Sequence, residues 1–354
     1  MSRFWSPNIA DLEPYVPGEQ PRGTQLVKLN TNESAYPPSP QVFAAIRAAA
    51  DDKLRLYPDP RASELCDVLA SYHQVQSSQI FVGNGSDEVL GFAFMALLRD
   101  KGTLCFPDIS YSFYPVWAKL LGIATRIIPL DDAYRIDFAQ YPQDCSGIIF
   151  PNPNAPTGIA TPLTVIEQLA VDRPDSVIIV DEAYVDFGAE SAVALVNNYP
   201  NLLVVRTFSK ARGLAGLRVG YAIGHSDLIE GLVRVKDSFN SYPLDLLAQK
   251  GAVASIQDDD YFIDTVTKTC ACRSQMVEGL VQLGFEVLPS AANFVLVRHS
   301  VMSGEMLQQQ LRSYGIITRH FRAPRLSAWL RITVGNEQDV DSLIQSLKQI
   351  LAQP

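Results

Sequence analysis

An apolar run that ends in a lysine and a glycine-rich turn decides the fold. Residues 202–218 read Leu202-Leu203-Val204-Val205-Arg206-Thr207-Phe208-Ser209-Lys210-Ala211-Arg212-Gly213-Leu214-Ala215-Gly216-Leu217-Arg218. An aliphatic run without polar alternation is typical of a strand that is buried on both faces, and such strands occur mainly in parallel sheets. The run therefore predicts an α/β fold with Lys210 just beyond the carboxyl end of a buried strand.

The same pattern recurs upstream. Short apolar runs end in turns of Gly, Pro, Asn or Asp at Gln79–Val82, Thr103–Phe106, Ser146–Phe150 and Val177–Val180, and helix-like sequence follows. We expect a mostly parallel central sheet flanked by helices. In open α/β sheets ligands bind at the carboxyl ends of the strands, which predicts one site fed by several strand ends.

The chain is long enough for more than one core. At 354 residues and 39.0 kDa, two domains are expected. Residues 1–40 are rich in proline and predict an extended arm that packs with the smaller domain. We expect a large ligand-binding domain over residues 41–245. Residues 246–354 predict a smaller α+β domain, with helices at Leu246–Ile256 and Thr265–Leu283 and strands at Phe285–Leu288, Asn293–Val297 and Trp329–Val334.

Composition excludes several classes of function. The chain is 47% hydrophobic and 19% charged, which is typical of a globular protein, and its net charge of -9 with no basic stripe argues against nucleic acid. The five cysteines lack a CxxC pair, so we expect neither a disulfide framework nor a zinc site. No signal peptide or membrane-spanning stretch is visible, and a cytoplasmic location is expected.

Lys210 and Asp181 suggest one chemistry. An amine is a covalent catalyst toward carbonyls, and pyridoxal 5'-phosphate is the cofactor that offers a carbonyl, an electron sink and a phosphate. Asp181, which ends the run Val177–Val180, suits the pyridinium nitrogen that must stay protonated. Tyr184, three positions later, can reach the cofactor's phenolic oxygen. The alternatives are a solvated lysine at a strand end and a helix-capping aspartate.

A phosphate site is predicted at Gly83–Glu88. Its glycines, Gly85 included, let backbone approach a ligand, and the following helix presents free N–H groups. Alternatively, Asp87 and Glu88 are first-turn charges that complement the helix dipole. Arg218 and Ser209 favour the phosphate reading, because a guanidinium offers a bidentate fork and a hydroxyl can donate.

With these residues in view, the chain resembles the fold-type-I pyridoxal-phosphate-dependent aminotransferases and, within them, the histidinol-phosphate aminotransferases. The resemblance covers nearly the whole chain. The motifs that carry it are Lys28–Tyr36, Leu56–Asp59, Gly83–Glu88, Asn154–Gly158, Asp181–Tyr184, Thr207–Lys210 and Leu330–Gly335.

The resemblance implies a role for each matching residue. Lys210 would be the Schiff-base lysine and the proton-transfer group, Asp181 the pyridinium partner and Tyr184 a donor to the phenolic oxygen. Tyr111 would stack on the cofactor ring. The phosphate would be bound by Ser86, the Asp87 amide, Ser209 and Arg218, and in a homodimer with shared sites by Tyr57 of the neighbouring subunit. Arg331, Arg319, Tyr15 and Asn32 would bind substrate, although Arg319 is equally well read as a solvated surface arginine.

Two departures from the family pattern stand out. Ala155 replaces the asparagine that usually precedes the proline of Asn-Pro-Thr-Gly, and we assign the contact with the phenolic oxygen to Asn154. Ser34-Ala35 stands where the pattern often has Asn-Pro.

The implied reaction is transamination of L-histidinol phosphate, a small-molecule amino donor, with a keto acid, 2-oxoglutarate. It yields imidazole acetol phosphate and glutamate, as in histidine biosynthesis. The nearest alternative is an aromatic amino-acid aminotransferase. A phosphothreonine-type decarboxylase on the same scaffold, a pyridoxal-phosphate-binding regulator and a non-catalytic phosphate-binding protein are further alternatives.

Overall fold

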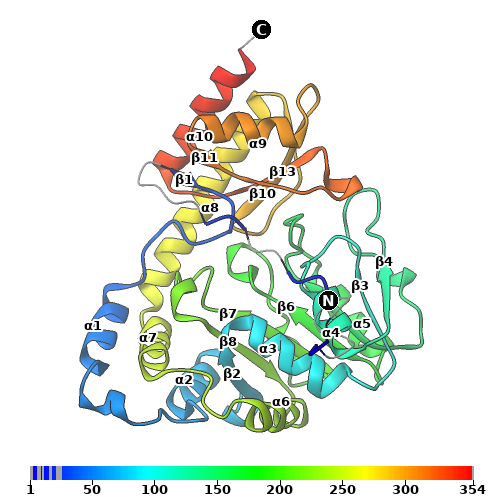
Figure 1. The fold of residues 1–354 in the computed structure, drawn as a ribbon, viewed down its shortest axis with the longest axis vertical. Helices are drawn as coiled ribbons and strands as arrows, with labels where there is room; N and C mark the ends of the chain where they lie inside the picture. The colour runs from blue at the N-terminus through cyan, green and yellow to red at the C-terminus, as the bar shows by residue number, and fades with distance from the viewer. Residues whose placement is uncertain (1–2, 6–8, 10–11, 16–17, 21–25, 353–354) are drawn as a thin grey trace.

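A seven-stranded sheet forms the centre of the larger part of the molecule (Figure 1). The structure, a computed structural model, describes residues 3–5, 9, 12–15, 18–20 and 26–352. The strand order is β2 (Ile80–Asn84), β8 (Val219–Gly224), β7 (Leu202–Thr207), β6 (Val177–Asp181), β5 (Cys145–Pro151), β3 (Thr103–Pro107) and β4 (Thr125–Ile128). Only β8 runs against its neighbours. The prediction of a mostly parallel sheet is confirmed.

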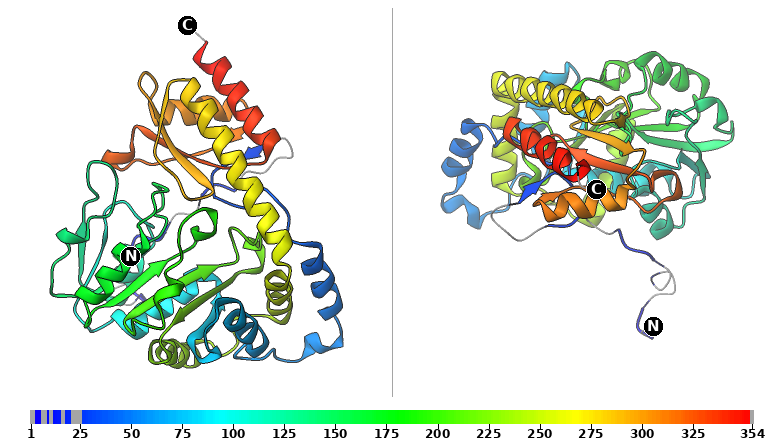
Figure 2. Two further views of the ribbon diagram at one scale, coloured as in Figure 1. Left: turned by 180° about the vertical axis from the view of Figure 1, so that it is seen from behind. Right: turned by 90° about the horizontal axis from the view of Figure 1, so that it is seen from above.

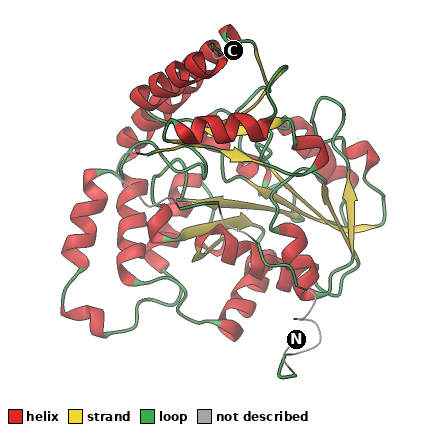
Figure 3. Ribbon diagram, turned by 45° about the horizontal axis from the view of Figure 1, so that its top comes forward, coloured by secondary structure: helices red, strands yellow, loops and turns green. Residues whose placement is uncertain are grey.

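Helices cover both faces of this sheet (Figure 3). Ile178 and Val180 of β6 pack into one apolar cluster, and Ile179 between them packs into the other, as the pleat of a strand requires. The first cluster includes residues of α1 (Pro40–Ala49), α2 (Ser63–His73), α5 (Leu163–Asp172) and α7 (Leu246–Gln257). The second includes residues of α3 (Gly85–Ala93), α4 (Tyr114–Leu121) and α6 (Ser226–Phe239).

A smaller antiparallel sheet lies above the large one in Figure 1. Its order is β12 (Arg319–His320), β13 (Trp329–Thr333), β10 (Phe294–His299) and β9 (Phe285–Val287). Three helices pack on it through a separate apolar cluster: α8 (Asp259–Gln282), α9 (Gly304–Ser313) and α10 (Glu337–Leu351). The long helix α8 extends from beside α7 to the small sheet, as Figure 2 shows from behind.

The amino-terminal segment joins the small sheet's side of the molecule. β1 (Val27–Lys28) pairs in parallel with β11 (Ile316–Ile317), and Leu29 is buried in the same cluster as α8. The exposed Glu19 carboxylate accepts two hydrogen bonds from Arg312 on α9, at 2.6 and 2.7 Å. Pro7, Pro17 and Pro21 of the predicted arm lie outside the described residues.

Short helical turns complete the fold. They are η2 (Asp52–Arg55), η3 (Ser77–Gln79), the π-helical η4 (Phe94–Leu98), η5 (Phe138–Gln140), η6 (Val185–Phe187), η7 (Ala192–Leu195), η8 (Ala215–Leu217) and η9 (Pro324–Leu326). In the described ranges no helix is long and apolar enough to cross a membrane, and no cluster of side chains is suited to a metal ion.

The cysteines differ from expectation at one pair. Cys105 on β3 and Cys145 on β5 form a disulfide between neighbouring strands. Their separation of 40 residues hides the pairing in the sequence, because only the sheet order brings the strands together. Cys66, Cys270 and Cys272 are free thiols.

Candidate active site

The carboxyl ends of the central strands open into a cavity of about 210 Å³. β5, β6 and β7 contribute Pro151, Asp181 and Thr207, and the turns after β2, β3 and β7 add further lining residues. Twelve of the predicted site residues line it: Tyr15, Asn32, Ser86, Asp87, Tyr111, Asp181, Tyr184, Ser209, Lys210, Arg218, Arg319 and Arg331. Residues that are far apart in sequence thus converge at the predicted edge of the sheet.

Lys210 presents its amine to this cavity. Its Nζ donates a hydrogen bond to the backbone oxygen of Thr31 at 3.0 Å and lies 5.6 Å from the centroid of the Tyr184 ring. No carboxylate is paired with Lys210 in the described part of the chain. A single bond to a carbonyl oxygen, which an incoming ligand can replace, is the main polar restraint on the amine.

Asp181 is buried at the bottom of the cavity, with 5% of the residue exposed. Its Oδ2 accepts a hydrogen bond from the hydroxyl of the fully buried Tyr114 at 2.9 Å, whereas Oδ1 has no hydrogen-bond partner among the described residues. Burial raises the pKa of this carboxyl to about 6, and the Tyr114 hydroxyl opposes the rise. A buried oxygen without a partner is costly, so Oδ1 is suited to a cationic donor on a ligand.

Asn32 connects the arm to Tyr184, which follows β6, and to Thr333 on β13. Its side-chain amide donates to the Tyr184 hydroxyl at 3.0 Å, and its Oδ1 accepts from Thr333 Oγ1 at 3.0 Å. Asn293 donates to the Asn32 backbone oxygen at 3.1 Å. The backbone of Asn32 is left-handed, with φ of 56°, a conformation that asparagine tolerates better than most residues.

Polar groups gather where α3 begins, at one end of the cavity. Arg218 donates to Ser209 Oγ at 3.4 Å and to Asp87 Oδ2 at 3.3 Å, and Tyr111 donates to Asp87 Oδ1 at 2.8 Å. Ser86 lies in the first turn of α3, where backbone N–H groups lack helical partners. The negative charge of Asp87 is paired with the guanidinium of Arg218. Asp87 therefore does not repel a nearby anion as an unpaired carboxylate would.

A second cationic group lines the cavity from the small sheet. Arg319 on β12 and Arg331 on β13 are direct cross-strand partners, and both line the cavity. Arg331 Nη2 donates to the Asn30 backbone oxygen at 2.8 Å, while its Nε is buried without a hydrogen-bond partner in the described ranges. Burial lowers the pKa of Arg331, and Arg319 adds to this effect. An anion bound between the two guanidiniums would compensate Arg331 for the water that it loses on burial, and it would offset the repulsion between Arg331 and Arg319.

Tyr15 closes this side of the cavity from the arm. Its ring stacks on Phe113 with centroids 4.9 Å apart and is tilted against Tyr111 at 6.2 Å. Burial raises the pKa of the Tyr15 hydroxyl, and the charges of Arg319 and Arg331 oppose the rise. The arm therefore supplies a neutral donor beside the arginine pair.

Three predicted residues do not line the cavity. Asn154 is buried behind it, where its amide donates to Ile109 O at 2.9 Å and to Thr157 Oγ1 at 3.1 Å, and its Oδ1 has no partner in the described part of the chain. Gly85 lies behind Arg218, since a Cβ on it would come 2.4 Å from Nη2. Tyr57 is 82% exposed and stacks on Tyr242.

Tyr114 and Thr31 are functional candidates that the strand-end pattern does not single out. Thr31 meets Lys210 through its backbone, which no side-chain pattern can reveal. For Tyr114 a weak signal exists. A tyrosine on the apolar face of a helix needs a partner for its hydroxyl when it is buried, but the sequence does not say which.

Known proteins resemble this chain over nearly its whole length. The profile of the family "Aminotransferase class I and II" matches residues 24–347. "Histidinol-phosphate aminotransferase 1" of Bradyrhizobium diazoefficiens is 56% identical, covering 99% of this chain and 100% of the relative. "Histidinol-phosphate aminotransferase" of Gluconacetobacter diazotrophicus is 58% identical, covering 99% of each.

A solved structure is similar over the same span. The crystal structure of histidinol-phosphate aminotransferase from Sinorhizobium meliloti in complex with pyridoxal-5'-phosphate superposes with a TM-score of 0.89 at 25% identity, covering 99% of this chain and 98% of that one. Family profile, relatives and fold agree over nearly the whole length. The chain therefore belongs to the class I and II aminotransferase family, among its histidinol-phosphate aminotransferases.

Proposed function

We propose that this protein binds pyridoxal 5'-phosphate and transfers the amino group of L-histidinol phosphate to 2-oxoglutarate. The observation that carries the proposal is the shared cavity of Lys210 and Asp181 between two cationic groups. Lys210 and Asp181 line the same cavity as Arg218, which precedes β8 of the large sheet, and the Arg319–Arg331 pair of the small sheet. A cofactor phosphate and a substrate phosphate each require a cationic group of this kind.

The residues present fit this cofactor. The unpartnered Asp181 Oδ1 suits a protonated ring nitrogen, and Tyr184, whose hydroxyl accepts from Asn32 and can still donate, suits the phenolic oxygen. The two donors of the Asn154 amide are used by Ile109 O and Thr157 Oγ1, so Asn154 would have to reorient to donate to this oxygen. Tyr111 would cover the ring, while Ser86, the Asp87 amide, Ser209 and Arg218 would hold the phosphate, with Gly85 admitting the backbone. When bound, the cofactor supplies an aldehyde for amines and a ring that accepts the electrons released at the substrate carbon.

Lys210 is the acid–base group in this proposal. Its Nζ would take the proton from the substrate carbon that carries the amine and deliver it to the cofactor carbon that has joined the amine, and it would move a proton the opposite way when the keto acid is aminated. Asp181 stays ionised beside the ring nitrogen, because a cationic partner lowers its pKa from the value that burial imposes. Tyr15 and Asn32 narrow the site from the arm, which excludes water from the reacting carbon.

The arginine pair sets the choice of substrate. A phosphate ester carries more charge than a carboxylate and has more acceptor oxygens, so it can engage Arg331 and Arg319 together with the Tyr15 hydroxyl. A substrate with a single carboxylate leaves part of this cationic surface uncompensated. The arrangement therefore favours histidinol phosphate over an aromatic amino acid.

We further infer a cytoplasmic homodimer with shared sites. Tyr57 stacks on Tyr242, both are exposed, and Leu54 and Leu56 beside Tyr57 in the sequence are exposed as well; exposed apolar residues that cluster are typical of interfaces. In such a dimer, Tyr57 would reach the phosphate end of the neighbouring site. Residues 1–40, 41–245 and 246–354 are our proposed arm, large domain and small domain, although α7 contributes to the large domain's apolar cluster.

The test uses the cofactor-loaded protein without any keto acid. Histidinol phosphate and phenylalanine are added separately, and the visible absorbance of the bound cofactor is followed. We expect rapid loss with histidinol phosphate and slow loss with phenylalanine. The reverse preference would identify an aromatic aminotransferase. Release of carbon dioxide without keto acid would identify a decarboxylase, and no change with either amine would rule out transamination of both.

A further inference from the structure

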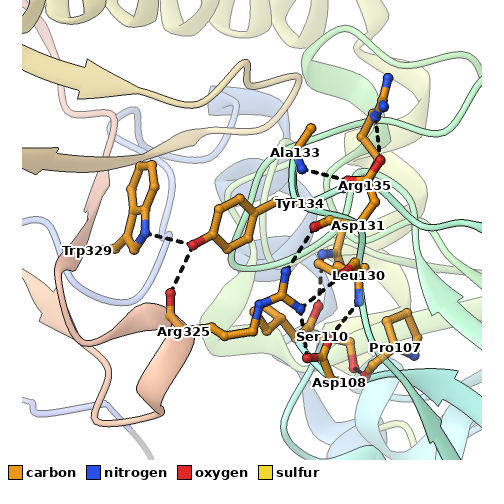
Figure 4. A network of polar contacts seen from close by, with 12 residues as sticks. Pro107, Asp108, Ser110, Leu130, Asp131, Ala133, Tyr134, Arg135, Arg325 and Trp329 are labelled. Carbon is orange, nitrogen blue, oxygen red and sulfur yellow. Dashed lines mark hydrogen bonds and ion pairs between the residues drawn. The ribbon is translucent and has the colours of Figure 1, made fainter.

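Arg325 crosses from the small sheet's side of the molecule to two turns of the large sheet. Its Nη1 donates to Asp108 Oδ2 at 3.0 Å and to Leu130 O at 3.1 Å, and its Nη2 donates to Asp131 O at 2.9 Å (Figure 4). Asp108 follows β3, and Leu130 and Asp131 follow β4. One guanidinium thus connects η9 to the ends of two neighbouring strands.

Tyr134 closes the contact from the other direction. Its hydroxyl donates to the Arg325 backbone oxygen at 3.0 Å and accepts from Trp329 Nε1 at 3.0 Å, and its ring centroid lies 5.3 Å from the Arg325 guanidinium carbon (Figure 4). Tyr134 holds a left-handed backbone, with φ of 61°, which is unfavourable for a residue with a bulky side chain. Hydrogen bonds from both residues therefore hold the turn that carries Tyr134 against the segment that carries Arg325.

Apolar side chains seal the same junction. Ile109 and Leu130 from the large-sheet turns pack with Leu326, Trp329 and Leu296, all five of them buried. Asp108 is held as well, because its Oδ1 accepts the backbone N–H of Leu130 at 2.9 Å. The network is therefore a contact around a sealed apolar core, with the Arg325–Asp108 ion pair partly exposed to solvent at its edge.

The junction lies directly behind two walls of the active-site cavity. Ser110 and Tyr111 follow Asp108 closely and line the cavity from the large sheet's side, as the Tyr111 wall. Arg319 and Phe321 precede Arg325 and line it from the small sheet's side, as the Arg319–Phe321 wall. Asp108, Tyr134 and Arg325 do not line the cavity. Their influence on a bound substrate must pass through the lining residues that they position.

We propose that Arg325 and Tyr134 form an interdomain clamp that sets the spacing between the Tyr111 wall and the Arg319–Phe321 wall. The clamp thereby determines how well the pocket fits the anionic end of the substrate, a role that rests on the proposed function. Arg325 is a positioning residue. Its loss weakens substrate binding and leaves the Lys210 chemistry unchanged.

The test compares Arg325→Ala with the wild type as cofactor-loaded proteins. Hydrogen–deuterium exchange should rise in both walls, residues 107–112 and 319–326. KM for histidinol phosphate should rise about tenfold, the size expected from losing charge-assisted hydrogen bonds that are partly exposed to solvent. The kcat value and the absorbance of the bound cofactor should stay near those of the wild type. Arg325→Lys keeps a positive charge near Asp108 but cannot donate from two nitrogens at once as the guanidinium does. Its KM should therefore lie between the values of the wild type and Arg325→Ala.

Arg234→Ala is the matched control. It removes an arginine whose 2.8 Å ion pair with Glu230 lies on exposed α6, away from the junction, and it should change neither KM nor exchange in the two walls. If Arg325→Ala folds poorly, Arg325→Lys and Tyr134→Phe carry the comparison.

The outcomes separate the clamp from the proposed function. Unchanged exchange in either wall, or raised exchange with an unchanged KM, overturns the clamp. If the wild type does not turn over histidinol phosphate, the proposed function fails. The exchange measurement alone then decides whether Arg325 couples the walls.

Discussion

At the scale of single residues, Asp181 shows how burial prepares a site for a ligand. One of its oxygens is fixed by Tyr114 and the other is buried without a hydrogen-bond partner among the described residues. The Tyr114 hydroxyl thus orients the carboxylate and favours its ionised form. Without a cationic ligand, the remaining oxygen is a local cost to the fold.

Replacing Tyr114 should change the acidity of the site. In Tyr114→Phe, the pKa of Asp181 should rise, both from about 6 in the cofactor-free protein and from its lower value with the cofactor bound, because the donor that favours the charged form is gone. We expect the acid limb of the pH profile of kcat/KM to move to higher pH by about 1 unit, the equivalent of one modest hydrogen bond.

Tyr141→Phe is the control for this experiment. Tyr141 is also buried, but its hydroxyl has no hydrogen-bond partner in the described ranges, and it is absent from the cavity lining. Its removal should leave the pH profile in place. A Tyr114→Phe profile that coincides with the wild type would show that the hydroxyl does not act on Asp181.

The raised pKa of Asp181 also makes the cofactor-free protein sensitive to pH. The folded pKa of about 6 exceeds the ordinary value of 3.8, so the folded state binds the proton more tightly than the unfolded state. The resulting destabilisation is absent below about pH 4 and complete above about pH 6. Asp181→Asn should therefore stabilise the cofactor-free protein by on the order of 2 kcal/mol at pH 7, and by progressively less toward pH 4.

Urea unfolding of both proteins at several pH values measures this difference. A constant difference between pH 4 and pH 7 would contradict the assigned titration. With cofactor bound the sign should reverse, because the asparagine cannot neutralise a protonated ring nitrogen.

Many residues of the candidate site can be predicted from the sequence, but the contacts between them cannot. Lys210 and Asp181 are predictable because each follows an apolar strand, and the carboxyl ends of parallel strands share one edge. The bond from Lys210 to the Thr31 backbone and the bond from Tyr114 to Asp181 are not, since both depend on which distant segments pack together.

At the scale of elements, the close contact between β8 and the start of α3 would form the phosphate end of the proposed site. A Cβ on Gly220 of β8 would lie 2.2 Å from the Ser86 nitrogen and 2.4 Å from the Gly85 carbonyl carbon. Backbone atoms cannot yield as a flexible side chain can. Glycine is therefore required at position 220 by the approach of another backbone.

Gly220→Ala should displace the first turn of α3. We expect a loss of cofactor affinity of at least about tenfold and a destabilisation of about 1–3 kcal/mol, as for other overpacked sites. Cofactor titration and urea unfolding measure the two effects. Gly216→Ala is the control, because a Cβ there meets nothing within 4 Å. Equal cofactor affinities for Gly220→Ala and Gly216→Ala would show that the close approach at Gly220 does not shape the phosphate end.

The strands that the sequence does not predict share a physical reason. β8 contains Gly220 and ends at Gly224, and glycine weakens the strand signal. Three of the four residues of β4 are exposed, and β12 has only two residues, so neither shows the continuous apolar run of a buried strand. Helix α8 begins at Asp259 and not at Thr265, because its first turn carries acidic residues that suit a helix N-terminus.

At the scale of the whole molecule, the exposed Tyr57 distinguishes a shared site from a self-contained one. Tyr57 lies outside the cavity of its own chain, yet we propose that it completes the phosphate end of a partner's site. Tyr57→Phe should therefore lower cofactor affinity by about tenfold, the value of one charge-assisted hydrogen bond, with little change in stability. Sedimentation equilibrium should give twice the chain mass of 39.0 kDa.

A monomer in solution, or unaltered affinity in Tyr57→Phe, would contradict the shared site. Tyr72→Phe serves as the control, because Tyr72 is also exposed but contacts Arg212 and His73 on its own chain. It should leave cofactor affinity unchanged.

We propose that Lys210 holds the cofactor and moves the proton, and chemical trapping of the bound cofactor identifies the amine that holds it. Borohydride reduction of the cofactor-loaded protein fixes the cofactor's aldehyde carbon to whichever amine holds it, and peptide mass spectrometry then locates the label. We expect the label on Lys210 alone, and none at that site in Lys210→Ala. A label on another lysine, or a Lys210→Ala protein that transaminates at near the wild-type rate, would contradict the account.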